Sequence, residues 1–109
     1  MEYLLIDGKV VCDLGSGTGI GGLAVLKFTN ASRVIMTDYT EEVNQLLLGN
    51  IKLQGKSFES RAETMLIDWT KPQHYDKIAG IDIAIATDVI YKGSPYKELA
   101  DLLSEVAEK

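Results

Sequence analysis

Residues 13–22, DLGSGTGIGG, place five glycines within eight positions directly after a short β-branched run. That run, residues 9–14 (KVVCDL), predicts a buried parallel strand, and the residues after the glycines have a helical pattern. Glycines at a strand–helix turn let the backbone bend sharply and let a ligand approach main-chain N–H groups. The spacing Gly17-x-Gly19-x-x-Gly22 matches the dinucleotide-binding pattern in this context, so the segment predicts a site for a nucleotide-like ligand.

After this turn, further predicted strands alternate with predicted helices along the chain. Short apolar runs predict three more strands, at residues 33–37, 63–68 and 81–87. A helix is expected to begin after Thr40 and to end near Gly55. Four apolar residues at helical spacing form its expected apolar face: Val43, Leu46, Leu47 and Ile51.

The order of the elements determines the expected architecture. A polar connection at residues 70–80 precedes the fourth strand, and Ser94-Pro95 opens a last helix. This order predicts an α/β fold with a Rossmann-like, doubly wound, mostly parallel sheet, truncated after the fourth strand and its following helix. We expect residues 1–109 to form a single domain, the N-terminal part of a longer one. The truncation would leave an unpaired edge on the fourth strand, which favours a homodimer through that edge.

Composition and charge restrict the classes of partner. Sixteen acidic residues against eleven basic ones give a net charge of −5, an unfavourable surface for nucleic acid or anionic lipid and a suitable one for a basic partner. No apolar run approaches a membrane span, and the N-terminus does not resemble a signal peptide. A lone cysteine, Cys12, is expected in the core and predicts a reducing, cytoplasmic location. Because no Cys/His cluster occurs, no metal site is expected, and the single histidine, His74, is expected to be solvated.

Two aspartates next to the glycine turn discriminate between ligands. Asp38, nineteen residues after Gly19 and at the end of the second predicted strand, suits a ribose hydroxyl in either a dinucleotide or an adenosyl ligand. Asp13, two residues before the first glycine, would repel a pyrophosphate but suits a cationic ligand that carries an amino group. The pair therefore favours S-adenosylmethionine over NAD.

The four motifs together resemble a known superfamily. DLGSGTGIGG, followed by VIMTD at residues 34–38, IDW at 67–69 and ATDVIY at 86–91, is similar to the seven-β-strand (class I) S-adenosylmethionine-dependent methyltransferases. Asp68-Trp69 together with the Asp88–Tyr91 tetrapeptide DVIY narrows the resemblance to the methyltransferase-like 21 group of protein-lysine methyltransferases. It extends from Lys9 to the last predicted helix.

The resemblance implies a set of cofactor-binding residues on the turn and at the strand ends: Asp13, Gly15, Ser16, Gly17, Gly19, Asp38, Asp68, Trp69 and Thr87. Residues 15–17 would surround the methionine moiety, and Asp38 would bind the ribose hydroxyls. Trp69 would lie beside the adenine, with Asp68 near its amino edge and Thr87 on the floor of the site. The ligand is expected in the crevice between the first and fourth strands, where a doubly wound sheet changes direction.

Asp88 and Tyr91, on the loop after the fourth predicted strand, resemble the signature that carries the chemistry in this family. Tyr91 can hydrogen-bond the incoming amine, and Asp88 can hold a lysine ammonium by a charge-assisted bond. A carboxylate beside a lysine favours its protonated form, so Asp88 is assigned to positioning. The absence of an Asp/Asn-Pro-Pro-Tyr/Phe pattern at this point agrees with an aliphatic amine acceptor rather than a nucleobase.

The sequence therefore predicts an enzyme that methylates lysine side chains of a protein. Two alternatives stay open within the same fold: a non-catalytic cofactor-binding or interaction module, and a methyltransferase with a small-molecule acceptor. An NAD-linked oxidoreductase would require Asp13 to tolerate a pyrophosphate.

Overall fold

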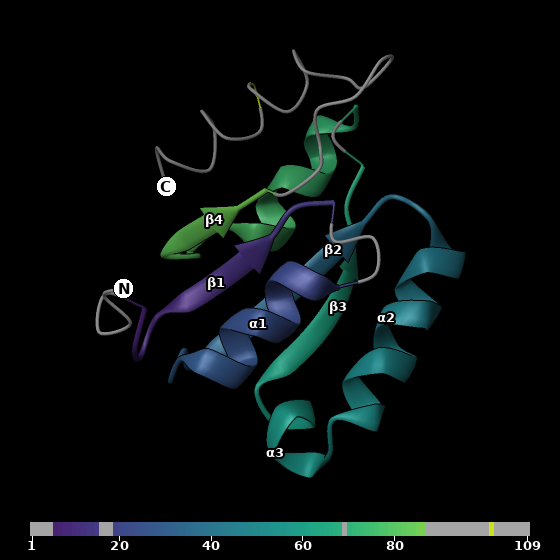
Figure 1. Cartoon of the computed structure of the whole chain (residues 1–109). Helices are drawn as coiled ribbons and strands as arrows, with labels where there is room; N and C mark the ends of the chain where they lie inside the picture. Colours follow the sequence, from purple (N-terminus) through teal and green to yellow (C-terminus); the bar gives the residue numbers. More distant parts are fainter. Residues whose placement is uncertain (1–5, 16–18, 69, 87–100, 102–109) are drawn as a thin grey trace.

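Four parallel strands form a single sheet in the computed structural model, which describes residues 6–15, 19–68, 70–86 and 101 (Figure 1). The strands are β1 (Val10–Asp13), β2 (Arg33–Asp38), β3 (Ala62–Leu66) and β4 (Ile83–Ile85). Their order in the sheet is β3-β2-β1-β4, and every neighbouring pair is parallel. The predicted doubly wound, parallel α/β architecture is thereby confirmed for the described part of the chain.

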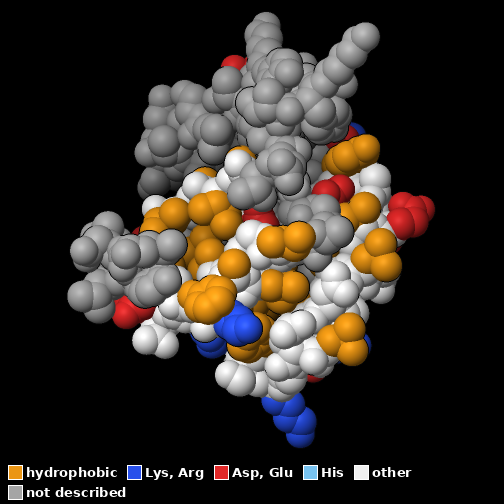
Figure 2. All heavy atoms as spheres, viewed as in Figure 1, with side chains coloured by type: hydrophobic (Ala, Val, Ile, Leu, Met, Phe, Trp, Pro, Cys, Tyr) orange, Lys and Arg blue, Asp and Glu red, His pale blue; other side chains and the backbone are white. Residues whose placement is uncertain are grey.

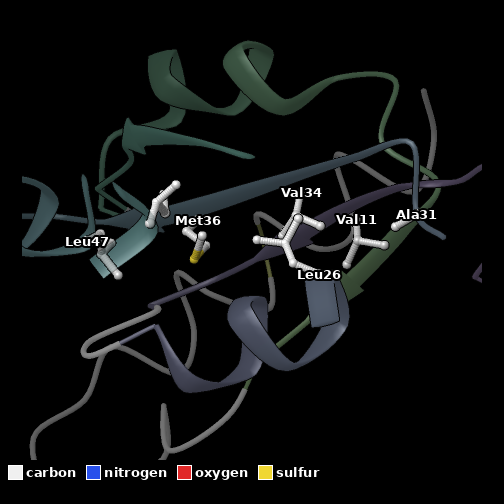
Figure 3. Packing of buried hydrophobic residues seen from close by; sticks show 7 residues of the cluster. Val11, Leu26, Ala31, Val34, Met36 and Leu47 are labelled. Carbon is white, nitrogen blue, oxygen red and sulfur yellow. The ribbon is translucent and has the colours of Figure 1, made fainter. Parts of the chain in front are cut away.

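Helices α1 (Ile20–Phe28) and α2 (Glu41–Leu53) lie on the same face of the sheet (Figure 1). Side chains from both helices meet the strands in one buried cluster, part of which Figure 3 shows: Val11, Leu26, Ala31, Val34, Met36, Leu47 and Ile51. Successive strand residues point to opposite faces, so β1 and β2 supply this cluster with alternate positions.

The opposite face of the sheet is covered by η2 (Pro72–Ile78), a 3₁₀ helix within the predicted polar connection at residues 70–80. Its buried Tyr75 and Ile78 join a second core cluster with strand residues of the other parity, including Cys12 and Ile35. The prediction that Cys12 lies in the core is confirmed, since its side chain is fully buried. A further short helix, α3 (Lys56–Glu59), was not predicted.

Helix α2 begins as its sequence predicts. The Thr40 hydroxyl accepts the main-chain N–H of Val43 at 3.3 Å, and Glu41 and Glu42 occupy the first turn, where carboxylates complement the helix dipole. The prediction of its apolar face was wrong at Leu46, which is 66% exposed. Figure 2 shows hydrophobic side chains at the surface on this side of the molecule.

The strand boundaries differ slightly from the predicted ones. Strand β3 ends at Leu66, so Asp68 lies two residues beyond it rather than within it. The helix predicted from Ser94-Pro95 lies outside the described residues, apart from residue 101, which is helical. In the described part of the chain, no helix is long and apolar enough to cross a membrane.

Candidate functional site

The strands all end at one edge of the sheet, called here the carboxyl edge, defined by Asp13, Asp38, Leu66 and Ile85. Strands β2 and β4 flank β1 on opposite sides, so the chain reverses its direction of winding between β1 and β4. The main-chain N–H of Leu14 donates to the oxygen of Ile85 at 2.8 Å and joins the ends of these two strands. The predicted reversal between the first and fourth strands is therefore confirmed. Ligands of doubly wound sheets bind at such a reversal, so the position of a ligand there stays a prediction.

The glycine turn connects β1 to α1 at the carboxyl edge. Gly15 and Gly19 have φ angles of 68° and 87°, a conformation that residues with a Cβ rarely adopt. A Cβ on Gly19 would also lie 2.9 Å from Cδ2 of Leu47 in α2. Glycine at position 19 is therefore required both by the backbone conformation and by the close approach of α2.

The Asp13 carboxylate is fully buried beneath the start of α1. Its Oδ2 accepts the N–H of Gly22 at 3.1 Å, and its main-chain oxygen accepts the Thr37 hydroxyl at 3.0 Å. Helix α1 begins after Gly19, which has no side chain to cap it, so Asp13 supplies an acceptor for the first turn from the neighbouring strand. Burial, and then the charge of Asp13, raise the pKa of Cys12 to about 12, so this thiol stays protonated.

Asp38 ends β2 with a nearly buried side chain. Its Oδ1 accepts the N–H of Tyr39 at 2.8 Å, which fixes the orientation of the carboxylate. Its main-chain oxygen accepts two donors, the N–H of Ile67 at 3.0 Å and Nδ2 of Asn44 at 3.3 Å. Hydrogen bonds to Asp38 thereby connect the C-terminal end of β2 to the residue after β3 and to the start of α2.

Asn44 is a buried polar residue that the sequence reasoning missed. Its Nδ2 also donates to the main-chain oxygen of Thr40 at 3.0 Å, whereas its Oδ1 is buried without a hydrogen-bond partner among the described residues. A signal was present in the sequence, because Asn44 precedes Leu47 and Ile51 by three and seven positions and thus falls on the buried stripe of α2.

Asp68 lies in a compact turn after β3. Its Oδ1 accepts both the N–H and the hydroxyl of Thr70, at 2.9 and 2.6 Å. These bonds from Thr70 are the main reason why the pKa of Asp68 lies below its ordinary value, with smaller contributions from Lys71 and His74. The carboxylate is therefore ionised at neutral pH.

His74 contacts the same turn from η2. Its Nδ1 accepts the main-chain N–H of Asp68 at 3.0 Å. The prediction that His74 is solvated was wrong, because the ring is half-buried and bonded. The error has a physical reason: a residue in a polar connection gives no periodic signal, and 3₁₀ helix η2 is fixed by the core contacts of its other side chains.

Of the predicted site residues, the structure brings five to the carboxyl edge and the turns beside it: Asp13, Gly15, Gly19, Asp38 and Asp68. The others lie outside the described residues and stay predictions: Ser16, Gly17, Trp69, Thr87, Asp88 and Tyr91. The described part of the chain contains no group of three or more His, Cys, Asp or Glu side chains that could hold a metal ion.

The described residues fit S-adenosylmethionine. The Asp38 carboxylate suits the two hydroxyls of a ribose, and the buried charge of Asp13 beneath the glycine turn favours a cationic ligand over a pyrophosphate. Gly15 and Gly19 have no Cβ, so no side chain of their own covers the backbone at the point where a ligand would approach it.

Comparison with known proteins gives a consistent result. Residues 5–109 match the lysine methyltransferase family. One curated relative is the protein-lysine N-methyltransferase EFM3 of Chaetomium thermophilum, 28% identical, over 95% of this chain and 33% of that protein. Another is the histidine protein methyltransferase 1 homolog of Dictyostelium discoideum, 32% identical, over 98% of this chain and 34% of that protein. The chain spans about a third of the length of these curated relatives.

Among solved structures, TrmK of M. capricolum in complex with S-adenosylhomocysteine has a similar fold. The two align with a TM-score of 0.68 and 14% identity, over 94% of this chain and 42% of that one. At this identity the likeness shows a shared fold.

Proposed function

The chain belongs to the lysine methyltransferase family, and from this we propose that it transfers a methyl group from S-adenosylmethionine to a lysine side chain of a protein. The match over residues 5–109 carries the proposal. The carboxyl edge supports it, because the glycine turn and the oriented Asp38 carboxylate lie beside the reversal between β1 and β4.

The sequence resemblance implies S-adenosylmethionine as the methyl donor, and membership of the lysine methyltransferase family supports this assignment. We propose that Asp38 accepts hydrogen bonds from its ribose hydroxyls and that the glycine turn surrounds its methionine moiety. Asp68 and Trp69 would form the adenine subsite, with Thr87 on its floor. Asp13 acts beneath the turn, where it fixes the first turn of α1 and contributes negative charge.

The bound cofactor supplies an electrophilic methyl group on a sulfonium. Transfer would form a bond between the lysine nitrogen and the methyl carbon as the carbon–sulfur bond breaks, and the electron pair of that bond would stay on sulfur. The lysine ammonium has to release one proton before the transfer, and no residue is assigned as its acceptor. The protein must hold the neutral amine about 3 Å from the methyl carbon and in line with the breaking bond. We assign this orientation to the Tyr91 hydroxyl, and the capture of the incoming lysine ammonium to Asp88.

The proposal extends to partner and location. A net charge of −5 supports a basic, lysine-bearing protein substrate rather than nucleic acid or a membrane surface. The single buried cysteine supports a cytoplasmic location. We also propose that residues 1–109 belong to one domain and that this domain self-associates through the free side of β4.

Titration calorimetry with S-adenosylmethionine, S-adenosylhomocysteine and NAD tests the cofactor. The wild-type chain is expected to bind both adenosyl ligands and not NAD. Asp38→Ala should weaken that binding roughly ten- to hundredfold, because it removes charged acceptors of hydrogen bonds. Glu59→Ala is the matched control, since Glu59 is an exposed carboxylate of α3, before the start of β3. Binding of NAD alone would show that the interpretation of Asp13 is wrong.

Transfer is tested with a labelled methyl donor and a protein array, followed by hydrolysis of the labelled proteins. The expected product is methyl-lysine, and Tyr91→Phe should lower the yield. Methyl-histidine instead would assign the acceptor named for the Dictyostelium discoideum relative. Cofactor binding without labelling of any protein would favour the non-catalytic module or a small-molecule acceptor.

A further inference from the structure

His74 joins η2 to the turn after β3 through the main chain of Asp68. The bond of 3.0 Å runs from the Asp68 N–H to Nδ1, so the neutral imidazole carries its proton on Nε2. Two further bonds connect the same segments: Lys71 N–H to the oxygen of Asp68 at 3.0 Å, and Lys77 Nζ to the oxygen of Leu66 at 3.3 Å. The position of this turn therefore depends on η2.

The buried side of η2 makes it a firm support. Tyr75 and Ile78 are 4% and 1% exposed and pack in the core cluster beneath β1 and β2. His74 belongs to the same helix and directly precedes Tyr75, so the packing of Tyr75 and Ile78 fixes the backbone of His74 relative to the sheet. The main-chain N–H of His74 donates to the oxygen of Lys71 at 2.9 Å, a hydrogen bond that forms the first turn of η2.

We propose that His74 is a positioning residue of the cofactor site, whose neutral imidazole holds the Asp68 main chain in the orientation that adenine binding requires. The inference rests on the proposed function, because the adenine subsite at Asp68-Trp69 is part of that proposal. Protonation of Nδ1 replaces the acceptor by a second donor facing the Asp68 N–H, so the turn must rearrange.

Burial and two lysine charges favour the neutral form of the imidazole. Among the described residues, three charged groups act on it: Lys77 on η2, Lys71 before η2, and Asp68 after β3. Burial first, then Lys77 and Lys71, lower the pKa of His74 below its ordinary 6.5, against the opposing charge of Asp68. The bond to Asp68 is therefore complete at pH 7 and is lost as the pH falls below 6.5 and through the lowered pKa.

Two substitutions separate the acceptor from its titration. In His74→Asn the side-chain oxygen is attached to Cγ, as Nδ1 is, so an acceptor is kept that does not titrate. His74→Leu has a similar bulk without an acceptor and leaves the Asp68 N–H unpaired. Thermal unfolding of both variants checks that the fold is retained.

The experiment measures the affinity of the 109-residue chain for S-adenosylhomocysteine from pH 8 to pH 5. Wild type should bind with constant affinity above pH 7 and lose about tenfold at acid pH, the effect of one hydrogen bond. His74→Asn should bind as wild type does at pH 7.5 and show no loss at acid pH. His74→Leu should bind about tenfold more weakly than wild type at pH 7.5 and show no further loss at acid pH. The inference is overturned if His74→Asn keeps the acid loss or if His74→Leu binds as wild type does at pH 7.5.

A second readout does not depend on the cofactor or on the variants. In the free wild-type chain, the NMR amide signal of Asp68 should titrate together with the imidazole signals of His74. If the chemical shift of the Asp68 amide does not change as the imidazole of His74 titrates, the inference is overturned, whatever the measured affinities are. If the two titrate together but S-adenosylhomocysteine binds at no pH, the proposed function fails and the role of His74 toward the cofactor fails with it.

Discussion

Gly22, the last glycine of the Gly17-x-Gly19-x-x-Gly22 spacing, is a packing residue. A Cβ added to it would lie 2.6 Å from both Cγ and Sδ of Met36, a contact that real Cβ atoms do not make. Met36 is itself fully buried between α1 and the sheet, so it has little room to move (Figure 3). The N–H of Gly22 also donates to Asp13, which places α1 directly against β1 and β2.

Gly22→Ala is therefore expected to destabilise the chain by about 1–3 kcal/mol through overpacking. Gly49→Ala is the matched control, because Gly49 is exposed within α2 and its added Cβ would meet nothing within 4 Å. That change should stabilise the chain by about 0.4–1 kcal/mol, since alanine favours the helix. Urea unfolding of both variants measures the two free energies. Equal effects would mean that Met36 moves aside without cost.

Asp13 and Asp38 show how far single residues could be predicted. Their place at the carboxyl edge follows from the sequence, because each ends an apolar run that predicts a parallel strand. The partner of Asp13 does not follow from it. The bond to Gly22 depends on where α1 starts and how closely it approaches β1, and both are set by tertiary packing.

At the scale of elements, Arg61 connects the start of β3 to the end of α1. Its guanidinium donates to three main-chain oxygens: Nε to Ala31 at 3.0 Å, and the two terminal nitrogens to Leu26 at 3.1 Å and Thr29 at 3.0 Å. These carbonyls belong to the last turn of α1 and the loop after it, where helix oxygens lack intrahelical partners. One planar side chain thus holds the C-terminal end of the helix.

Arg61→Lys is expected to lower the free energy of unfolding by about 1.5–3 kcal/mol, because lysine keeps the charge but cannot reach three acceptors as a planar fork does. Arg33→Lys is the control. Arg33 pairs with Glu63 at the surface, and an exposed pair of this kind contributes about 0–1 kcal/mol. Hydrogen exchange should also accelerate at the end of α1 in Arg61→Lys alone. Similar losses in both variants would contradict the role of Arg61.

The elements differ in how well their sequences predict them. Helix α2 is predicted by local signals, the Thr40 cap and a periodic apolar stripe. The exposure of Leu46 is not predicted by these signals. Leu46 lies about 100° around the helix from Leu47, and only one narrow face of α2 meets the sheet. Helices α3 and η2 are short, and η2 is held mainly by core contacts that no sequence period reveals.

At the scale of the whole molecule, the reversal of the sheet was expected from the family that the sequence resembles. Short connections through α1 and α2 place β2 and β3 successively on one side of β1, and β4 pairs with β1 on the other side. The proposed position of the site between β1 and β4 follows from this topology. The catalytic loop after β4 stays a prediction, since residues 87–100 lie outside the described part of the chain.

Strand β4 pairs with β1 and with no other described strand, so it forms one edge of the described sheet. Ala84, at its centre, is exposed. An uncharged edge strand can pair with a second copy, and a lysine on it opposes such pairing.

Sedimentation velocity over a concentration series should therefore show self-association of wild type and a shift toward monomer in Ala84→Lys. Ala24→Lys, which adds the same charge at an exposed position of α1, should associate as wild type does. A monomer at every concentration, or equal effects of the two lysines, would contradict pairing through β4.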